Sequence, residues 1–340
     1  MKIIGTSLHQ IDHENNLVQE RDGLEEGNQL SEYISILLQS VVKSNSKREF
    51  KFSSNLTQVR ASLDEMISNS FANATEGNAL RLLEKERLAQ EKIIQLRSEI
   101  QRGSLFQALV QDESEKNIII CKADHEEILD EVDLRIRSGL PMRKGLYKAM
   151  LVKFSNDNQI KNVFVYDTNP SMAKYWWQDY LELSEIYTPA YNTERSIDII
   201  LKKGIEPLKD NHGEDYQVLR NSLVGYFRNQ EEFDINQYIE NELRNYTPID
   251  PNLPKDRLIE KIIEFPEKHK FDVRFPVDNG SIKKRRITQK IKLSDSIELV
   301  FNDYVDNIRE IVSSEKDHEG NKYLKIKTEE GYKWFTELAE

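Results

Sequence analysis

Basic side chains gather in one acid-free stretch of this chain, residues 283–292. In a β-strand, alternate side chains project from one face, so Arg286, Lys290 and Lys292 would form a basic row, with Ile287 and Ile291 facing the core. Steps of about 6.6–7 Å in such a row are comparable to the spacing of phosphates along a nucleic-acid strand. The alternative is a solvated edge strand whose lysines prevent pairing with another sheet. The residues expected to bind phosphates are Lys283, Lys284, Arg285, Arg286, Lys290 and Lys292.

A second basic stretch extends from residue 135 to residue 148, again with no acid inside it. Its basic residues are Arg135, Arg137, Arg143, Lys144 and Lys148, and they follow an acid-rich run at 124–133. They form either a second phosphate-binding surface or partners for the neighbouring carboxylates. With 48 basic and 59 acidic residues, the chain has a net charge of −11. A chain of that charge does not bind polyanions indiscriminately, so any nucleic-acid contact must come from local basic patches.

The common glycine-rich nucleotide-binding motifs and the serine-hydrolase motif are absent from the sequence. Neither G-x-G-x-x-G nor G-x-x-x-x-G-K-[ST] occurs, and G-x-S-x-G is also missing. The single cysteine, Cys121, excludes a disulfide framework and lies in an apolar run, where we expect it to be buried. His9 and His13 would lie about 13 Å apart on a strand, too far to share a metal ion. We therefore expect no cofactor, no metal and no catalytic residue.

One tripeptide, Glu49-Phe50-Lys51, keeps a metal-dependent nuclease open as an alternative. Such nucleases place an acid before a D/E-x-K motif, so that two carboxylates hold a divalent ion and the lysine steadies the attacking water. The first acid would be Asp22, Glu25, Glu26 or Glu32, and the sequence does not select among them.

Apolar spacing predicts an α+β fold with an antiparallel sheet and helices in the N-terminal half. Alternating or β-branched runs predict strands at 2–11, 48–52, 103–110, 117–123, 146–154 and 163–166, of which the last four form two hairpins. Helical spacing occurs at 29–43, 58–72 and 79–102. The helix at 79–102 packs on the sheet or pairs with a partner helix; its apolar stripe is interrupted by Glu86, and Gly103 is placed to end it. Trp176 and Tyr180 share a helical face, which is typical of core packing, with base stacking as the alternative.

The C-terminal half combines a helical section with a β-meander. Five segments between residues 171 and 264 have helical spacing, and most of them are separated by prolines. Strands are predicted at 285–292, 296–301, 307–313 and 322–327, with a turn at 317–320. We therefore expect two domains, an α+β domain at 1–168 and a helical section followed by a basic β-meander at 169–340.

Five segments share their pattern with one known family. In the N-terminal half they are the long charged helix running into GSLFQALV, the segment NIIICKADHEEILDE and the basic segment GLPMRKGLYKAMLVKF. In the C-terminal half they are the basic segment followed by IELVFNDYV and the hairpin IVSSEKDHEGNKYLKIK. With these segments, the chain resembles the 37-kDa nucleoid-associated protein family (NdpA-like). The resemblance implies a soluble bacterial protein associated with the nucleoid, with no established enzymatic activity and no catalytic motif.

Together these observations lead us to expect a cytoplasmic, nucleoid-associated protein that contacts nucleic-acid phosphates without catalysis. No segment matches a groove-reading helix-turn-helix or a zinc finger, so we expect double-stranded DNA to be bound without sequence preference. No apolar run reaches the ~18–20 residues that span a bilayer, so we expect no membrane partner. A scaffold that works through another protein, in phage defence or chromosome maintenance, is an alternative. We also expect a homodimer, formed through the apolar stripe of the helix at 79–102.

Overall fold

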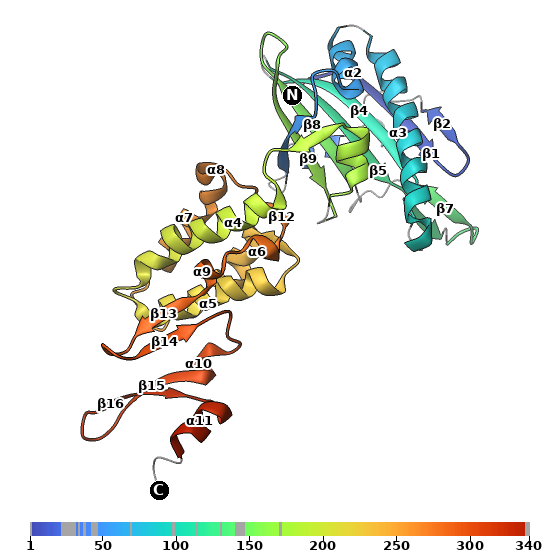
Figure 1. Cartoon of the computed structure of the whole chain (residues 1–340). Helices are drawn as coiled ribbons and strands as arrows, with labels where there is room; N and C mark the ends of the chain where they lie inside the picture. Colours follow the sequence, from blue (N-terminus) through green and yellow to red (C-terminus); the bar gives the residue numbers. More distant parts are fainter. Residues whose placement is uncertain are drawn as a thin grey trace. The chain divides into compact units, whose positions relative to one another are not determined.

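The computed structural model describes residues 2–336, except residues 22–31, 33–34, 37–38, 42–46, 69, 97–98, 113–114, 130, 140–146 and 170–171. The chain divides into two compact units, Met1–Tyr187 and Thr188–Glu340 (Figure 1). The fold is mixed α+β, as the sequence predicts. The first unit extends beyond residue 168, where the sequence analysis places the domain boundary. It does so because strand β10 (Leu183–Glu185) pairs with strand β3 (Arg48–Phe52) of the same unit.

An eight-stranded antiparallel sheet forms the first unit, in the order β10-β3-β9-β8-β5-β4-β1-β2. The hairpins β4–β5 and β8–β9 are the two that the sequence predicts. A separate hairpin pairs β6 (Glu126–Leu129) with β7 (Ile136–Gly139). The other strands of the sheet are β1 (Lys2–Asp12), β2 (Leu17–Glu20), β4 (Gly103–Asp112), β5 (Glu115–Asp124), β8 (Tyr147–Phe154) and β9 (Ile160–Asp167).

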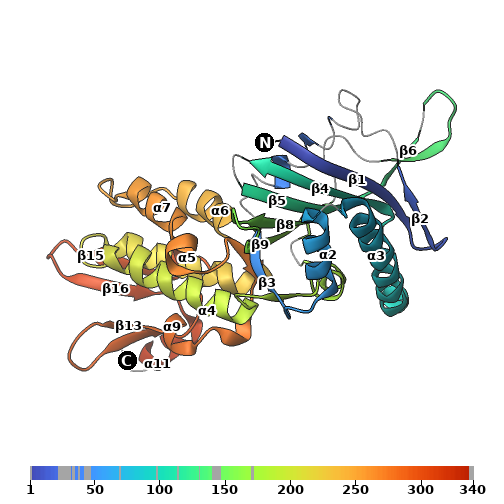
Figure 2. The ribbon, with the colours of Figure 1, turned by 90° about the horizontal axis from the view of Figure 1, so that it is seen from above.

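Two helices, α2 (Gln58–Ile67) and α3 (Phe71–Ile93), lie on one face of this sheet (Figure 2). The Thr57 side chain caps α2 by accepting a hydrogen bond from the Arg60 N–H group at 3.3 Å. Helix α3 begins and ends earlier than the predicted 79–102. Its apolar side, which includes Leu82, is buried in the core, so the prediction that it packs on the sheet is confirmed.

The glycine expected to end that helix has another role. Gly103 begins strand β4, ten residues beyond the last residue of α3. A Cβ atom at this position would lie 2.4 Å from the Ala123 carbonyl oxygen, so only glycine allows the two strands to approach this closely. Of the helix predicted at 29–43, the described residues 32, 35, 36 and 39–41 are helical, and the rest lie outside the described residues.

Helices around an aromatic and aliphatic core begin the second unit. Thr188 caps the first of them by accepting from the Tyr191 N–H group, and Pro189 occupies the first turn. Phe227 and Phe233 stack in the core with ring centroids 4.7 Å apart. The elements are α4 (Pro189–Ile199), η3 (Ile200–Ile205), η4 (Glu206–Leu208), α5 (Gly213–Asn229), α6 (Ile235–Tyr238), η5 (Ile239–Arg244), α7 (Lys255–Ile263) and α8 (Phe265–His269), with a hairpin of β11 (Glu232–Asp234) and β12 (Arg274–Pro276).

The C-terminal part contains two small hairpins where the sequence predicts a β-meander. The first pairs β13 (Gln289–Lys292) with β14 (Glu298–Phe301), and the second pairs β15 (Val312–Lys316) with β16 (Lys322–Ile326). Asp317 forms the predicted turn of the second hairpin by accepting from the backbone N–H groups of Glu319 and Asn321. The short helical elements are η6 (Asn279–Ser281), α9 (Lys284–Ile287), α10 (Ile308–Ile311) and α11 (Glu329–Thr336).

Candidate functional site

The basic stretch 283–292 is only partly a strand. Lys284–Ile287 form the single helical turn α9, closed by a 2.8 Å hydrogen bond from the Thr288 N–H group to the Lys284 carbonyl. The buried side chain of Arg220 donates to the Ile287 carbonyl at 2.7 Å, which satisfies the end of this turn. The prediction of one continuous basic row is therefore wrong, because Arg286 belongs to the turn and only Gln289–Lys292 are extended.

Lysines of this stretch are nevertheless displayed on the surface. Lys283, Lys284, Lys290 and Lys292 are exposed, whereas Ile287 is buried, as the sequence predicts. Their acidic neighbours are Glu194 beside Lys283, Glu298 at 3.9 Å from Lys290 and Asp295 at 2.7 Å from Lys292. Exposed ion pairs contribute roughly 0–1 kcal/mol, so these lysines can exchange their partners for phosphates. The side chains of Arg285 and Arg286 lie outside the described residues.

The second basic stretch does not form one described surface. Arg135 is exposed near the hairpin β6–β7, whereas Lys148 lies in strand β8 and is only 7% exposed. The Arg137 side chain, Arg143 and Lys144 lie outside the described residues. Lys148 therefore does not share an exposed surface with Arg135 and belongs to a buried group of charges.

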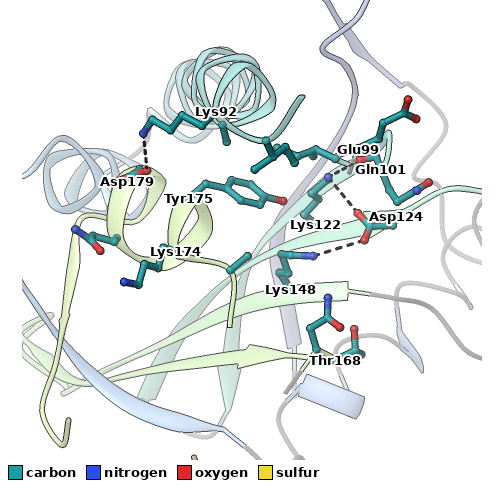
Figure 3. A pocket seen from close by; sticks show the side chains of 16 residues that line it. Lys92, Glu99, Gln101, Lys122, Asp124, Lys148, Thr168, Lys174, Tyr175 and Asp179 are labelled. Carbon is teal, nitrogen blue, oxygen red and sulfur yellow. Dashed lines mark hydrogen bonds and ion pairs between the residues drawn. The ribbon is translucent and has the colours of Figure 1, made fainter. Parts of the chain in front are cut away.

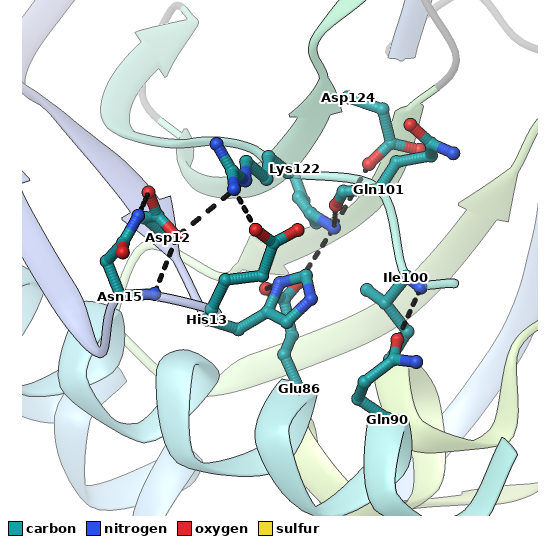
Figure 4. Close-up of polar contacts among 11 residues, drawn as sticks. Asp12, His13, Asn15, Glu86, Gln90, Ile100, Gln101, Lys122 and Asp124 are labelled. Atoms are coloured by element: carbon teal, nitrogen blue, oxygen red, sulfur yellow. Dashed lines mark hydrogen bonds and ion pairs between the residues drawn. The ribbon is translucent and has the colours of Figure 1, made fainter. Parts of the chain in front are cut away.

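Four charged side chains form this group, which we call the charge chain: Glu86, Lys122, Asp124 and Lys148. Figure 4 shows Glu86, Lys122 and Asp124, and Figure 3 shows Lys122, Asp124 and Lys148. The Lys122 Nζ atom lies 2.7 Å from Glu86 Oε1 and 3.1 Å from Asp124 Oδ1, and it donates to the Gln101 carbonyl at 2.6 Å. Lys148 Nζ lies 3.6 Å from Asp124 Oδ2. Buried charges persist only when they are paired, and this chain of contacts pairs them.

Strand register explains why these groups meet. Lys122 on β5 is the cross-strand neighbour of Lys148 on β8, and Lys148 is the neighbour of Asp167 on β9. The three side chains therefore share one face of the sheet. Helix α3 lies on that face and supplies Glu86, which is fully buried.

Electrostatics keeps Lys122 charged in this environment. Burial lowers the pKa of its ammonium group, but the Glu86 and Asp124 carboxylates outweigh that effect and raise the pKa above its ordinary value. Burial also raises the pKa of the Asp167 carboxyl, against the opposing influence of Lys148. The Tyr175 hydroxyl has a pKa raised by burial as well, so it stays protonated at neutral pH.

A cavity of about 700 Å³ opens beside the charge chain, a size typical of small-molecule sites (Figure 3). It lies between the end of α3, residues 99–101 and the π-helix η2 (Tyr175–Tyr180). The Tyr175 hydroxyl is directed toward Lys122 and has no hydrogen-bond partner among the described residues. Polar side chains that line the cavity include Lys92, Gln101, Lys148, Thr168, Lys174 and Gln178.

The sequence contained a signal for this group that its analysis did not use. Glu86 occupies a position where the apolar stripe of the helix requires an apolar residue, and Lys122 lies inside the apolar strand 117–123. Two charged residues of opposite sign, each in a core position, are expected to pair. The interruption of the apolar stripe at Glu86 was recognised in the sequence, and the lysine inside the apolar strand was not.

The nuclease motif does not gather a metal site in the described part of the chain. Glu49 and Lys51 lie on β3, where Glu49 Oε1 accepts a 2.7 Å hydrogen bond from Asn162. Asp22, Glu25 and Glu26 lie outside the described residues, and Glu32 is exposed. Among the described residues, no group of three or more His, Cys, Asp or Glu side chains could hold a metal ion.

Two other predictions about single residues are confirmed. Cys121 is buried, and burial raises the pKa of its thiol, so it is not a reactive nucleophile. Trp176 and Tyr180 are buried in the core of the first unit, with ring centroids 5.1 Å apart. They are therefore not a surface for stacking bases.

Comparison with models of known protein families and with curated proteins finds no match for this chain. In the portion that the structure describes, no helix combines the length and apolarity needed to cross a membrane. The resemblance to the nucleoid-associated family stays a prediction from the sequence.

Proposed function

We propose that this protein is a non-catalytic, nucleoid-associated protein that contacts the phosphates of double-stranded DNA through residues 283–292. The observation that carries the proposal is the exposure of Lys283, Lys284, Lys290 and Lys292 on a segment anchored by buried Ile287. The resemblance noted in the sequence points to the same function.

Phosphate contact through lysines explains how an acidic chain can bind DNA. Each lysine that replaces a counterion on the duplex releases that ion, so affinity is gained locally whatever the net charge of the chain. Contacts to phosphates position a protein without reading bases. Binding is therefore independent of DNA sequence and weakens steeply with salt.

Charge reversal in this segment tests the proposal. The variant Lys284→Glu/Lys290→Glu/Lys292→Glu should lower affinity for duplex DNA at low salt by at least about tenfold in a gel-shift titration. The matched control is Lys203→Glu/Lys209→Glu/Lys268→Glu, which reverses three exposed lysines elsewhere in the same unit and should bind DNA more strongly than the first variant. Equal affinities for the two variants would contradict the proposal.

A second candidate function is the binding of a small, acceptor-rich molecule in the cavity beside the charge chain. The observation that favours it is Lys148, whose ammonium group reaches the cavity and has one carboxylate within 4 Å among the described residues, Asp124 at 3.6 Å. Its remaining donors, together with the Tyr175 hydroxyl, suit a carboxylate or phosphate group.

Thermal unfolding in the presence of inorganic phosphate tests this second function. Phosphate should raise the melting temperature of the wild type more than that of Lys148→Met, because a ligand stabilises only the form that binds it. The control Lys161→Met removes an exposed lysine of the same sheet and should respond like the wild type. An equal response of Lys148→Met would exclude a site at this amino group.

A further inference from the structure

The C-terminal segment 288–336 folds without a core of its own. It contains both hairpins β13–β14 and β15–β16 and helices α10 and α11, yet none of its residues is buried. All five residues of β16 are exposed. A two-stranded hairpin is at best marginally stable in water unless a face of it is covered. Something outside this segment must therefore cover it.

Large apolar side chains of this segment are exposed to solvent in the single chain. The most exposed are Tyr332, Trp334 and Phe335 of α11, at 69%, 80% and 73%. Apolar surface of this extent on a folded chain marks an interaction site. Further residues of the same kind, 39–57% exposed, are Leu293, Ile297, Val300, Tyr323, Leu324 and Ile326.

An apolar cavity of about 530 Å³ lies in the same unit, between the two hairpins, α5 and α10. No residue of α11 lines it, so this helix does not fill the cavity of its own chain. Glu214 and Arg309 are its charged lining residues. The apolar residues that line it include Ile249, Ile291, Leu299, Phe301, Val312 and Leu324.

Helix α11 matches this cavity in apolar character and in charge. It presents three exposed aromatic side chains, which are the residue types that most often anchor interfaces. Its first turn carries Glu329 and Glu330, which complement Arg309, and its last turn carries Lys333, which complements Glu214. When a chain carries both an apolar helix and a matching cavity, a twofold-symmetric dimer lets the helix of each copy fill the cavity of the other.

We propose that a second copy of this chain covers the segment, with α11 of each copy seated in the apolar cavity of the other. The expected dimer contact through the stripe of helix α3 has less surface to offer, because Leu82 of that stripe is buried within one chain. The proposal is independent of DNA binding. It also places two copies of the stretch 283–292 in one particle, which raises the effective concentration of weak phosphate contacts along a duplex.

The mass of the full chain in solution tests the proposal. Sedimentation of the wild type at micromolar concentration should give twice the 39.9 kDa of one chain. Trp334→Glu/Phe335→Glu should sediment as a monomer with an unchanged circular dichroism spectrum. The control Leu56→Glu alters a side chain that is 93% exposed in the first unit and should remain a dimer. The proposal would be overturned if the wild type sediments as a monomer. It would also be overturned if Trp334→Glu/Phe335→Glu still sediments as a dimer.

A charge swap tests the seating of α11 without changing an apolar residue. Arg309→Glu should weaken dimerisation at least about tenfold, because it places like charges against Glu329 and Glu330. Adding Glu329→Lys/Glu330→Lys should restore most of the lost affinity. If the combined variant dimerises no better than Arg309→Glu alone, α11 does not occupy this cavity.

Discussion

The eight-stranded sheet of the first unit and the two C-terminal hairpins are both built from antiparallel strands, but they differ in how much of their surface is buried. The sheet buries apolar residues on both faces and encloses even the charges of Glu86 and Lys122. No residue of the hairpins of 288–336 is fully buried. The first region completes its core within one chain, whereas the second leaves large apolar side chains exposed.

Ion pairs show the same contrast. In the charge chain, removal of one partner leaves a buried charge without its counter-charge, which lowers the free energy of unfolding. Around β13, Lys290 and Lys292 pair with exposed acids, and water can replace each partner. The buried charges of the first region therefore depend on one another, whereas the exposed charges of the second can exchange their partners.

The largest expected effect comes from breaking the charge chain. Glu86→Leu leaves Lys122 without its closest carboxylate and should lower the free energy of unfolding by about 3–5 kcal/mol in urea titrations. The double variant Glu86→Leu/Lys122→Met removes both charges and should recover most of that loss. If the single variant loses less than about 1 kcal/mol, the buried pair is not coupled as its geometry requires.

A somewhat smaller loss of stability is expected when a leucine is truncated, and its size should depend on how deeply that leucine is buried. Leu82→Ala, in the core beneath α3, should destabilise the protein by about 2–5 kcal/mol, because it leaves a cavity. The same truncation at Leu324, which is 42% exposed, should cost less than half as much when it is made in the Trp334→Glu/Phe335→Glu monomer. Equal losses in urea unfolding would show that 288–336 has a core of its own.

Acidification should act on the first region through His9 and His125. Burial lowers the pKa values of His9 and His125, in His125 with a further contribution from Lys122. Between the ordinary histidine pKa of about 6.5 and these lower values, the unfolded chain binds more protons than the folded chain. Stability should therefore fall as the pH drops from 7 to about 5.

Replacement of both histidines tests whether they cause this pH dependence, and the turn at Asp317 provides a comparison within the same chain. His9→Gln/His125→Gln should flatten the pH dependence measured by thermal unfolding. In the C-terminal hairpin, hydrogen bonds, the first of them from Asn321, hold the pKa of Asp317 to about 2, so this turn should not respond in the same range. An unchanged slope in the double variant would place the titrating groups elsewhere.

The smallest effect is expected for the exposed pairs. Lys290→Gln should change the free energy of unfolding by less than about 1 kcal/mol, because Glu298 lies 3.9 Å away at the surface. The same variant should still weaken DNA binding. A larger loss of stability would show that Lys290 has a structural role.

Local patterns predicted the α+β class, the hairpins β4–β5 and β8–β9 and the burial of Cys121, because alternation and polar turns act over a few residues. The contact between Glu86 and Lys122 was not predicted, because only the packing of α3 on β5 brings them together. The turn at Lys284–Ile287 was missed for a similar reason, since Arg220, far away in sequence, satisfies its end. Predicting such features requires knowledge of which elements meet.

Equilibrium binding of duplex DNA as a function of salt tests the central claim, that the exposed lysines of 283–292 contact phosphates. Fluorescence anisotropy should show the logarithm of the association constant falling linearly with the logarithm of salt concentration, with a slope of about −0.9 per phosphate contacted. The slope should be the same on unrelated DNA sequences. In Lys284→Glu/Lys290→Glu/Lys292→Glu it should be shallower by about one for each lysine lost. An affinity that does not change with salt, or a slope unchanged in this variant, would contradict the claim.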